Sequence, residues 1–169
     1  MRYLILSACL ALPLPLPALA QDAATGGGAQ AALTSAETCM RSATDPQDRT
    51  ACLGQAAAQC IEAAGPANAA VRAECLGWER DYWQTGLDQT MGELVTALEV
   101  KDAAADGSVA DAFRAAQDAW QMWRDAECGY AAERLDDATA ASAAQASCEM
   151  ALTGSRALQV EAELAAATQ

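Results

Sequence analysis

The chain has 169 residues, of which 23 are acidic, 10 are basic and none is histidine, so its formal net charge at pH 7 is −13. Such an acidic surface repels phosphate backbones and anionic lipid headgroups, which argues against nucleic acid as a partner and favours a basic protein or a cation. A simpler explanation stays open, because acidity also keeps an exported protein in solution.

The first 20 residues have the pattern of a secretory signal peptide. Arg2 supplies a positive charge, residues 3–19 are almost wholly apolar, and Ala-Leu-Ala at 18–20 forms a small-residue cleavage site. A lipoprotein box ending at Cys9 is an alternative, but only about six apolar residues precede that cysteine and the apolar run continues beyond it. We therefore expect cleavage after residue 20 and a periplasmic or secreted protein.

Removal of the signal peptide leaves 149 residues with nine basic and 23 acidic side chains, a net charge of −14 on one ordinary domain. Three prolines interrupt the N-terminal apolar run, and no later stretch is long and apolar enough to span a bilayer. We predict a flexible leader at 21–33, rich in Gly, Ala and Gln, followed by one domain at 34–169. Its parts are a cysteine-rich extension at 34–66 and a core bundle at 67–166.

Six cysteines remain in the mature chain, and an even number in a small exported protein indicates three disulfides. Spacing alone leaves 15 possible pairings open. A metal site is disfavoured because the chain has no C-x-x-C motif and no histidine, and we expect no cofactor. The six are Cys39, Cys52, Cys60, Cys75, Cys128 and Cys148.

The mature chain is predicted to be all-α, because no segment shows sustained alternation of period two and alanine favours helix. Asp45 with Pro46 starts a helix, Gly65 with Pro66 breaks the chain, and residues 106–108 form a turn. The fold expected is an antiparallel helical bundle stapled by disulfides, with one long central helix and a short N-terminal helical hairpin. The five predicted helices cover about 35–42, 46–63, 67–101, 109–135 and 139–166.

Two of these helices carry apolar stripes at steps of three, four or seven residues. The stripe of helix 67–101 contains Leu76, Trp83, Leu87, Thr90 or Met91, Leu94 and Leu98. The seam predicted for helix 109–135 contains Phe113, Ala116, Trp120, Trp123, Glu127 and Tyr130, and we expect it to face the third and fifth helices. Both of its tryptophans are thereby assigned to the core.

Arg124 and Asp125 flank this seam as neighbours in sequence. Adjacent residues on a helix do not face each other, so each is expected to pair with another element. The plausible partners are Glu79, Asp81 and Arg156.

Two segments resemble the lysozyme inhibitor LprI-type family. The first reads A-Q-x-A-W-x-x-W-R-D-A-x-C at 116–128, followed by Cys148 and by L-T-x-x-R-x-L at 152–158. The second is C-L-x-x-E-x-x-Y-W-x-x-x-L at 75–87, similar to the long N-terminal helix of the family. The chain departs from the family pattern at Asp88, at Met91 and at Asp-Asp 136–137. As family-signature structural residues the resemblance implies Glu79, Trp83, Gln117, Trp120, Arg124, Asp125, Thr153 and Arg156.

The resemblance also implies a disulfide pairing. It joins Cys60 to Cys75 and Cys128 to Cys148, which leaves Cys39 with Cys52. Helix geometry agrees, since Cys52 and Cys60 lie eight residues apart on one predicted helix, roughly 12 Å and too far for a bond. A hairpin at the turn before Pro46 would bring Cys39 and Cys52 together.

By resemblance, the expected function is binding and inhibition of lysozyme-type muramidases, with a lysozyme as the basic protein partner. Such inhibition needs an acidic or polar surface that occupies a cleft which itself works with two carboxylates. The candidate contacts are Glu133, Asp136 and Asp137.

The alternative is a structural or binding module of the cell envelope without lysozyme activity. An enzyme is not expected, because the chain has no histidine, no spare thiol, no glycine-rich phosphate loop and no G-x-S-x-G motif.

Overall fold

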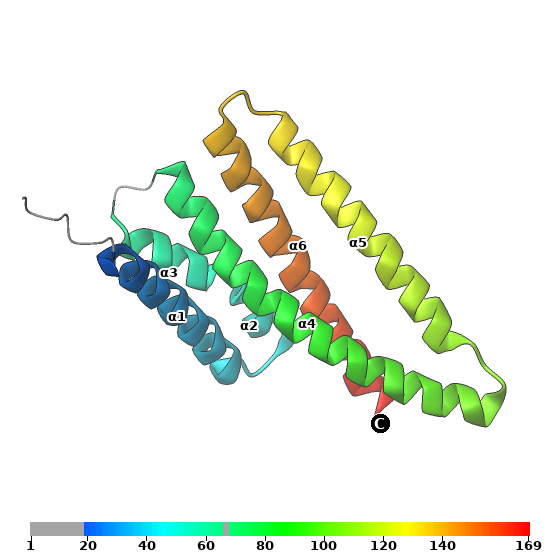
Figure 1. Ribbon diagram of the computed structural model, residues 1–169. Helices are drawn as coiled ribbons and strands as arrows, with labels where there is room; N and C mark the ends of the chain where they lie inside the picture. Colours follow the sequence, from blue (N-terminus) through cyan, green and yellow to red (C-terminus); the bar gives the residue numbers. More distant parts are fainter. Residues whose placement is uncertain (1–18, 66–67) are drawn as a thin grey trace, which may run out of the picture.

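The computed structural model describes residues 19–65 and 68–169, and within these ranges every regular element is an α-helix (Figure 1). The predicted signal peptide lies outside the described residues, apart from its last two positions. No helix in the described part has both the length and the hydropathy of a membrane span. The six helices are α1 Leu19–Ser42, α2 Pro46–Ala51, α3 Gln55–Ala63, α4 Ala69–Ala105, α5 Val109–Glu133 and α6 Ala138–Ala167.

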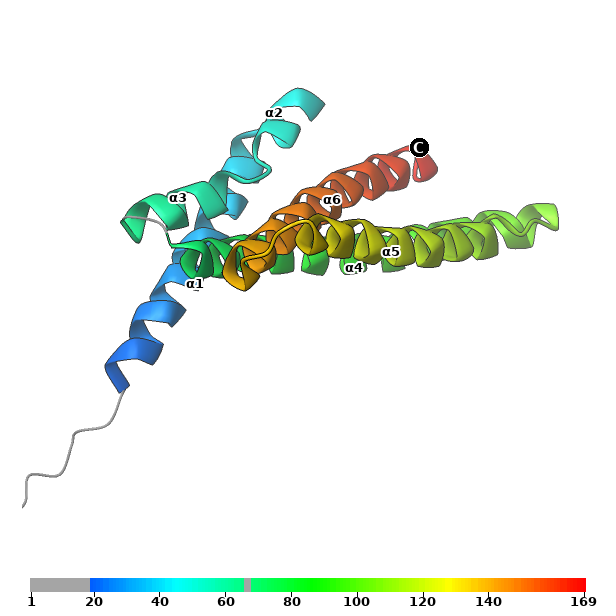
Figure 2. The same cartoon turned by 90° about the horizontal axis from the view of Figure 1, so that it is seen from above.

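The three C-terminal helices form an up-down-up bundle, in which α5 runs antiparallel to α4 and α6 (Figure 1). The 37 residues of α4 make it the long central helix, and its most extensive packing is against α6. Helices α1 and α3 pack on α4, and α5 lies on the opposite side of the bundle (Figures 1 and 2). The all-α, disulfide-stapled fold predicted from the sequence is therefore confirmed.

The limits of α4 are set by local polar groups. The Asn68 side chain accepts a hydrogen bond from the Val71 N–H and so caps the N-terminus. Asp106 ends the helix in the left-handed conformation at φ 50°. Asp102 then accepts from the N–H groups of Val109 and Ala110 at 3.0 and 2.8 Å, and these would otherwise be unpaired at the start of α5.

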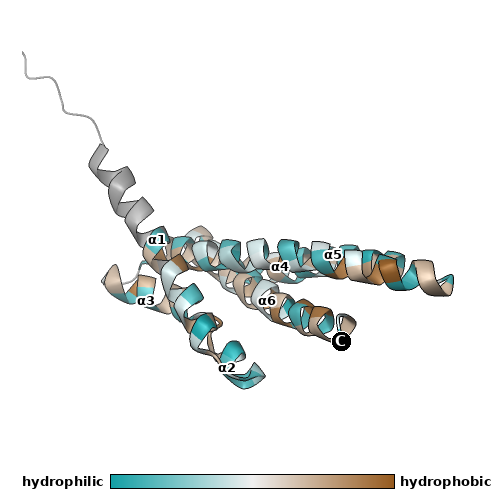
Figure 3. Ribbon diagram, turned by 90° about the horizontal axis from the view of Figure 1, so that it is seen from below, coloured by the Kyte–Doolittle hydropathy of each residue, from teal (hydrophilic) through white to brown (hydrophobic). Residues whose placement is uncertain are grey.

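The core lies between α4 and α6, and the α4 stripe predicted from the sequence forms its centre. Hydrophobic and hydrophilic residues alternate along these helices (Figure 3). On α6, Gly154 lets two neighbours approach closely, since an added Cβ would lie 2.4 Å from Leu53 Cδ2 and 3.2 Å from the Trp83 ring. Buried members of the α4 stripe are Leu76, Trp83, Leu87 and Leu94, and Met91 and Leu98 pack against them.

The N-terminal extension differs from the prediction in two ways. Helix α1 begins at Leu19, so the stretch predicted as a flexible leader is helical, which its alanines favour and its three glycines at 26–28 disfavour. The helix predicted at 46–63 is divided into α2 and α3, because Gly54 between them has φ 83°, a conformation that interrupts a helix and suits glycine.

The seam predicted for α5 is correct for Phe113 and Trp120, which pack against the core, and wrong for its other four members, because the helix is rotated about its axis from the predicted orientation. Ala116, Trp123, Glu127 and Tyr130 are exposed. The face that packs inward instead contains Ala110, Phe113, Gln117, Trp120, Arg124 and Cys128, at steps of three and four residues. The disulfide at Cys128 fixes this orientation, since its sulfur must point towards α6.

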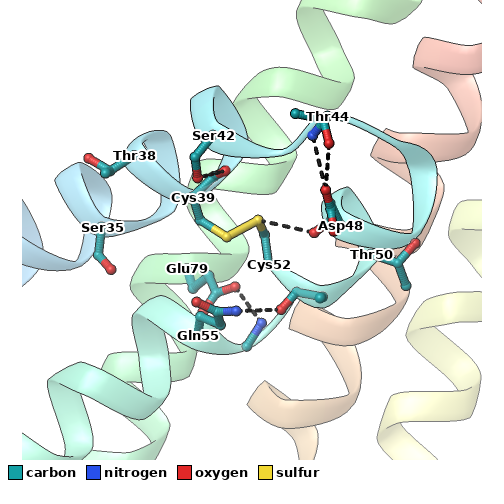
Figure 4. Close-up of a disulfide and its surroundings, with 12 residues drawn as sticks. Ser35, Thr38, Cys39, Ser42, Thr44, Asp48, Thr50, Cys52, Gln55 and Glu79 are labelled. Atoms are coloured by element: carbon teal, nitrogen blue, oxygen red, sulfur yellow. Dashed lines mark hydrogen bonds between the residues drawn. A yellow bond between two sulfur atoms is a disulfide. The ribbon is translucent and has the colours of Figure 1, made fainter.

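Three disulfides join successive elements, with the pairing that the family resemblance implies. Cys39–Cys52 connects α1 to the end of α2 (Figure 4), Cys60–Cys75 connects α3 to α4, and Cys128–Cys148 connects α5 to α6. Their Cα–Cα distances are 5.8, 5.8 and 5.4 Å, within the range that unstrained bridges adopt.

Candidate functional site

Glu79 ties the N-terminal extension to the central helix from an interior position beside the turn between α2 and α3 (Figure 4). Its carboxylate accepts from the backbone N–H groups of Gly54 and Ala57 at 2.6 and 2.7 Å, and from Trp83 Nε1 at 3.0 Å. Gly54 is the N-cap of α3 and has no side chain to cap the helix. Glu79, only 1 % exposed, therefore supplies the cap from α4, where the helix dipole also favours a negative charge.

Arg124 joins all three helices of the bundle through one guanidinium group. Its Nη1 donates to Gln84 Oε1 on α4 at 2.9 Å and to Thr153 Oγ1 on α6 at 3.2 Å. Its Nε and Nη2 both donate to Asp125 Oδ1, at 3.0 and 2.8 Å. The expectation that neither residue of the Arg124–Asp125 pair bonds the other is wrong, because the long arginine side chain folds back to reach its neighbour. Only 11 % of the Arg124 side chain is exposed, whereas Asp125 faces solvent.

A second arginine completes this interhelical cluster. Arg156 on α6 donates from Nε to Gln117 Oε1 on α5 at 2.8 Å. The guanidinium groups of Arg124 and Arg156 lie 5.3 and 6.0 Å from the centroid of the Trp120 ring, within cation–π range. Glu79, Trp83, Gln117 and Thr153 are buried as well. The signature side chains thus act between helices, and only Asp125 among them is well exposed.

Replacing Arg124 with alanine is expected to lower the free energy of unfolding by about 2 kcal/mol, since Gln84 and Thr153 lose a charged donor and Trp120 loses a cation. Urea unfolding followed by circular dichroism measures the change. Arg72→Ala, at an exposed position on α4, is the matched control and should change stability by under about 0.5 kcal/mol. If Arg124→Ala instead lowered the free energy of partner binding by more than the free energy of unfolding, Arg124 would belong to a binding surface.

The three acidic residues predicted as partner contacts lie together at the turn between α5 and α6. Glu133 is the last residue of α5, Asp136 lies in the connection, and all three side chains are exposed. Asp137 has a local role that sequence reasoning missed, since its Oδ1 accepts from the Ala140 N–H at 2.7 Å and caps α6. Glu133 and Asp136 have no ion-pair partner among the described residues, so both carboxylates are available to a partner.

The solvent side of α5 carries a second apolar stripe, and the predicted seam had assigned three of its members, Ala116, Trp123 and Tyr130, to the core. Met122, Trp123 and Tyr130 are 70, 48 and 61 % exposed. Three exposed alanines lie along the same side of the helix. We call this surface the outer face of α5, made of Ala116, Ala119, Met122, Trp123, Ala126 and Tyr130. The signal that could have revealed it is that large apolar residues occur on two sides of this helix.

A groove of about 720 Å³ lies between α1, α4 and α6. Trp78, Tyr82 and Met40 form its apolar wall, and Glu37 and Glu161 are among its acidic residues. Burial, and then the nearby charges of Glu37 and Glu161, raise the pKa of the Tyr82 hydroxyl above its usual range. Arg49 lines the same groove and pairs with Glu161, and Glu37 pairs with Arg41, so the groove has an apolar wall and a rim of paired charges.

Comparison of the sequence with known proteins identifies one family and one relative. The family model described as lysozyme inhibitor LprI matches residues 60–160, which extend from α3 through most of α6. A Rhodobacter capsulatus protein, described as an uncharacterized 17.7 kDa protein in the puhA 5′ region, is 30 % identical over 159 residues, covering 89 % of this chain and 95 % of the relative. No solved structure matches the chain. The matched range contains the interhelical cluster and the Cys60–Cys75 and Cys128–Cys148 bonds, and the chain belongs to the lysozyme inhibitor LprI family.

Proposed function

We propose that this protein is exported to the periplasm and inhibits lysozyme-type muramidases by binding with an acidic surface at the α5–α6 end of the bundle. Family membership supports the class of target. The observation that carries the proposal is the group of exposed carboxylates at Glu133, Asp136 and Asp137, next to the outer face of α5.

Charge supports a basic enzyme as the partner. The mature chain has nine basic and 23 acidic residues, and a domain with that excess attracts a strongly basic muramidase over a Debye length, about 8–10 Å at moderate salt. Oppositely charged surfaces accelerate encounter and suppress binding to acidic proteins. Inhibition then requires only that the bound protein cover the cleft, without any catalytic group of its own.

The disulfides support export. Three bonds among the six cysteines of the mature chain are typical of proteins that fold in an oxidising compartment. The apolar N-terminus with a small-residue site at 18–20 provides the route there.

Titration of the purified, oxidised mature protein against c-type, g-type and i-type lysozymes tests the proposal. We expect inhibition of at least one type at micromolar protein or below, weaker at moderate than at low salt because the attraction is screened. Neutralising Glu133 and Asp136 together, as Glu133→Gln and Asp136→Asn, should slow association several-fold. Absence of binding and inhibition for all three types would refute the proposal.

A second candidate is an envelope module that binds a small ligand, and the groove beside Tyr82 favours it. In that case a small apolar ligand would change the fluorescence of Trp78, which lines the groove, and no lysozyme would be inhibited. Trp78→Phe serves as the control for the origin of the signal.

A further inference from the structure

The outer face of α5 is a continuous apolar surface that the fold leaves uncovered. Trp123 and Tyr130 are seven residues apart, so they project from nearly the same side of the helix, two turns from each other. The helix surface between and beside these two aromatic residues is flat, because the small side chains of Ala116, Ala119 and Ala126 occupy it. Exposed aromatic residues on a flat helical surface are typical of protein contact sites.

Charged groups border this surface on both sides. Asp118 lies along one edge of the outer face and Glu127 along the other, at the angular positions that 100° per residue gives. Neither forms an ion pair within the described part of the chain. Glu133 extends the acidic border towards the α5–α6 turn. The two sides of the aromatic centre are thus flanked by free carboxylates, and at its C-terminal end the guanidinium of Arg134 lies over the Tyr130 ring, 5.8 Å from the ring centroid.

Charge decides between the possible occupants of this surface. A second copy of the chain would bring its own excess of acidic residues against the same acidic borders, and anionic headgroups would be repelled in the same way. A cationic protein matches the borders and can cover the aromatic centre. The surface therefore fits a basic protein with an apolar or aromatic depression.

We infer that the outer face of α5 lies over the substrate cleft of the muramidase while the acidic borders contact the basic rim of that cleft. This inference rests on the proposed function and specifies its geometry. A muramidase cleft contains two carboxylates, so an acidic side chain placed inside would meet like charge. Ligand clefts are otherwise lined mainly by hydrophobic and aromatic side chains. The neutral face carrying Trp123 and Tyr130 therefore suits the cleft better than the acidic turn does.

The two parts of the surface should act on different rate constants. Acidic residues at a rim steer the encounter, and their loss lowers the association rate and its dependence on salt. Buried aromatic residues at the centre of an interface hold the complex together, and their loss raises the dissociation rate. The roles of Trp123 and Asp118 can therefore be separated by kinetics.

The experiment compares three variants on an immobilised lysozyme that the wild-type protein inhibits. Trp123→Ala with Tyr130→Ala should dissociate roughly tenfold faster or more, with an almost unchanged association rate. Asp118→Asn with Glu127→Gln should associate several-fold more slowly at low salt and lose most of that difference at moderate salt. Val100→Ala, an exposed apolar position at the far end of α4, is the control and should match the wild type.

Competition tests whether the cleft itself is covered. An N-acetylglucosamine trimer, a ligand of muramidase clefts, should be displaced by the wild-type protein, and the Trp123/Tyr130 double variant should displace it roughly tenfold less well. Simultaneous binding of the trimer and the protein, or an unchanged dissociation rate for the double variant, would overturn the inference and leave inhibition itself intact. Sedimentation showing a wild-type dimer that the double variant abolishes would also overturn it, since a second copy would then cover the face. Failure of the wild type to bind any lysozyme would instead refute the proposed function and this inference with it.

Discussion

Replacing Glu79 with alanine is expected to lower the free energy of unfolding by about 3–5 kcal/mol, which is a large part of the stability of an ordinary domain. The truncation leaves three donors without an acceptor, namely the N–H groups of Gly54 and Ala57 and the indole N–H of Trp83. It also opens a cavity next to the core, since Glu79 is almost fully buried. Urea unfolding followed by circular dichroism measures the loss.

Two further variants distinguish the stability lost with the hydrogen bonds of Glu79 from the stability lost with its negative charge, and from the effect of removing any glutamate from α4. Glu74→Ala removes an exposed glutamate from the same helix and should change stability by under about 0.5 kcal/mol. Glu79→Gln keeps one carbonyl oxygen but turns an amide N–H₂ towards backbone donors, so its loss should lie between those of the two alanine variants. A loss below about 1 kcal/mol for Glu79→Ala would show that α3 is held without this carboxylate.

Reduction of all three disulfides is expected to unfold most of the protein at room temperature. The bonds close sequence separations of 13, 15 and 20 residues, and each contributes about 3 kcal/mol by restricting the unfolded chain. Their sum approaches the entire free energy of unfolding of an ordinary domain, about 5–15 kcal/mol. The helical circular dichroism signal of the native protein should therefore fall steeply with added reductant.

Serine variants of single pairs show where the stabilisation lies. Cys128→Ser with Cys148→Ser should still fold, with a free energy of unfolding lower by about 3 kcal/mol. A reduced wild-type chain that keeps its full helical signal and its cooperative urea transition would contradict the expected dependence on the bonds.

The sequence predicts well those elements in which large apolar residues are buried on one side only. In α4, the spacing of Leu76, Trp83, Leu87 and Leu94 indicated the buried stripe, and the structure buries all four. In α5, large apolar residues occur on two sides, so periodicity could not decide between them. The inward face of that helix includes Gln117 and Arg124, whose polar groups are satisfied by α4 and α6. Hydropathy assigns such residues to the surface.

Contacts between distant segments could not be predicted from spacing at all. Nothing local indicates that Glu79 caps a helix whose N-cap residue, Gly54, lies 25 residues earlier. The same contact explains why the N-terminal hairpin contains two short helices, because a glycine without a cap of its own receives one from α4. The outer face of α5 was hidden for the opposite reason, since its aromatic residues resemble core residues until the orientation of the helix is known.

The order of the disulfides has a consequence for biogenesis. The six cysteines that follow the predicted signal peptide bond in consecutive pairs along the chain, in the order Cys39–Cys52, Cys60–Cys75 and Cys128–Cys148. When such a chain enters an oxidising compartment with its N-terminus first, each bond can close as soon as its second cysteine arrives, before any wrong partner is present. Oxidation in order of arrival therefore gives the native pairing directly, and a thiol oxidase suffices without an enzyme that reshuffles disulfides.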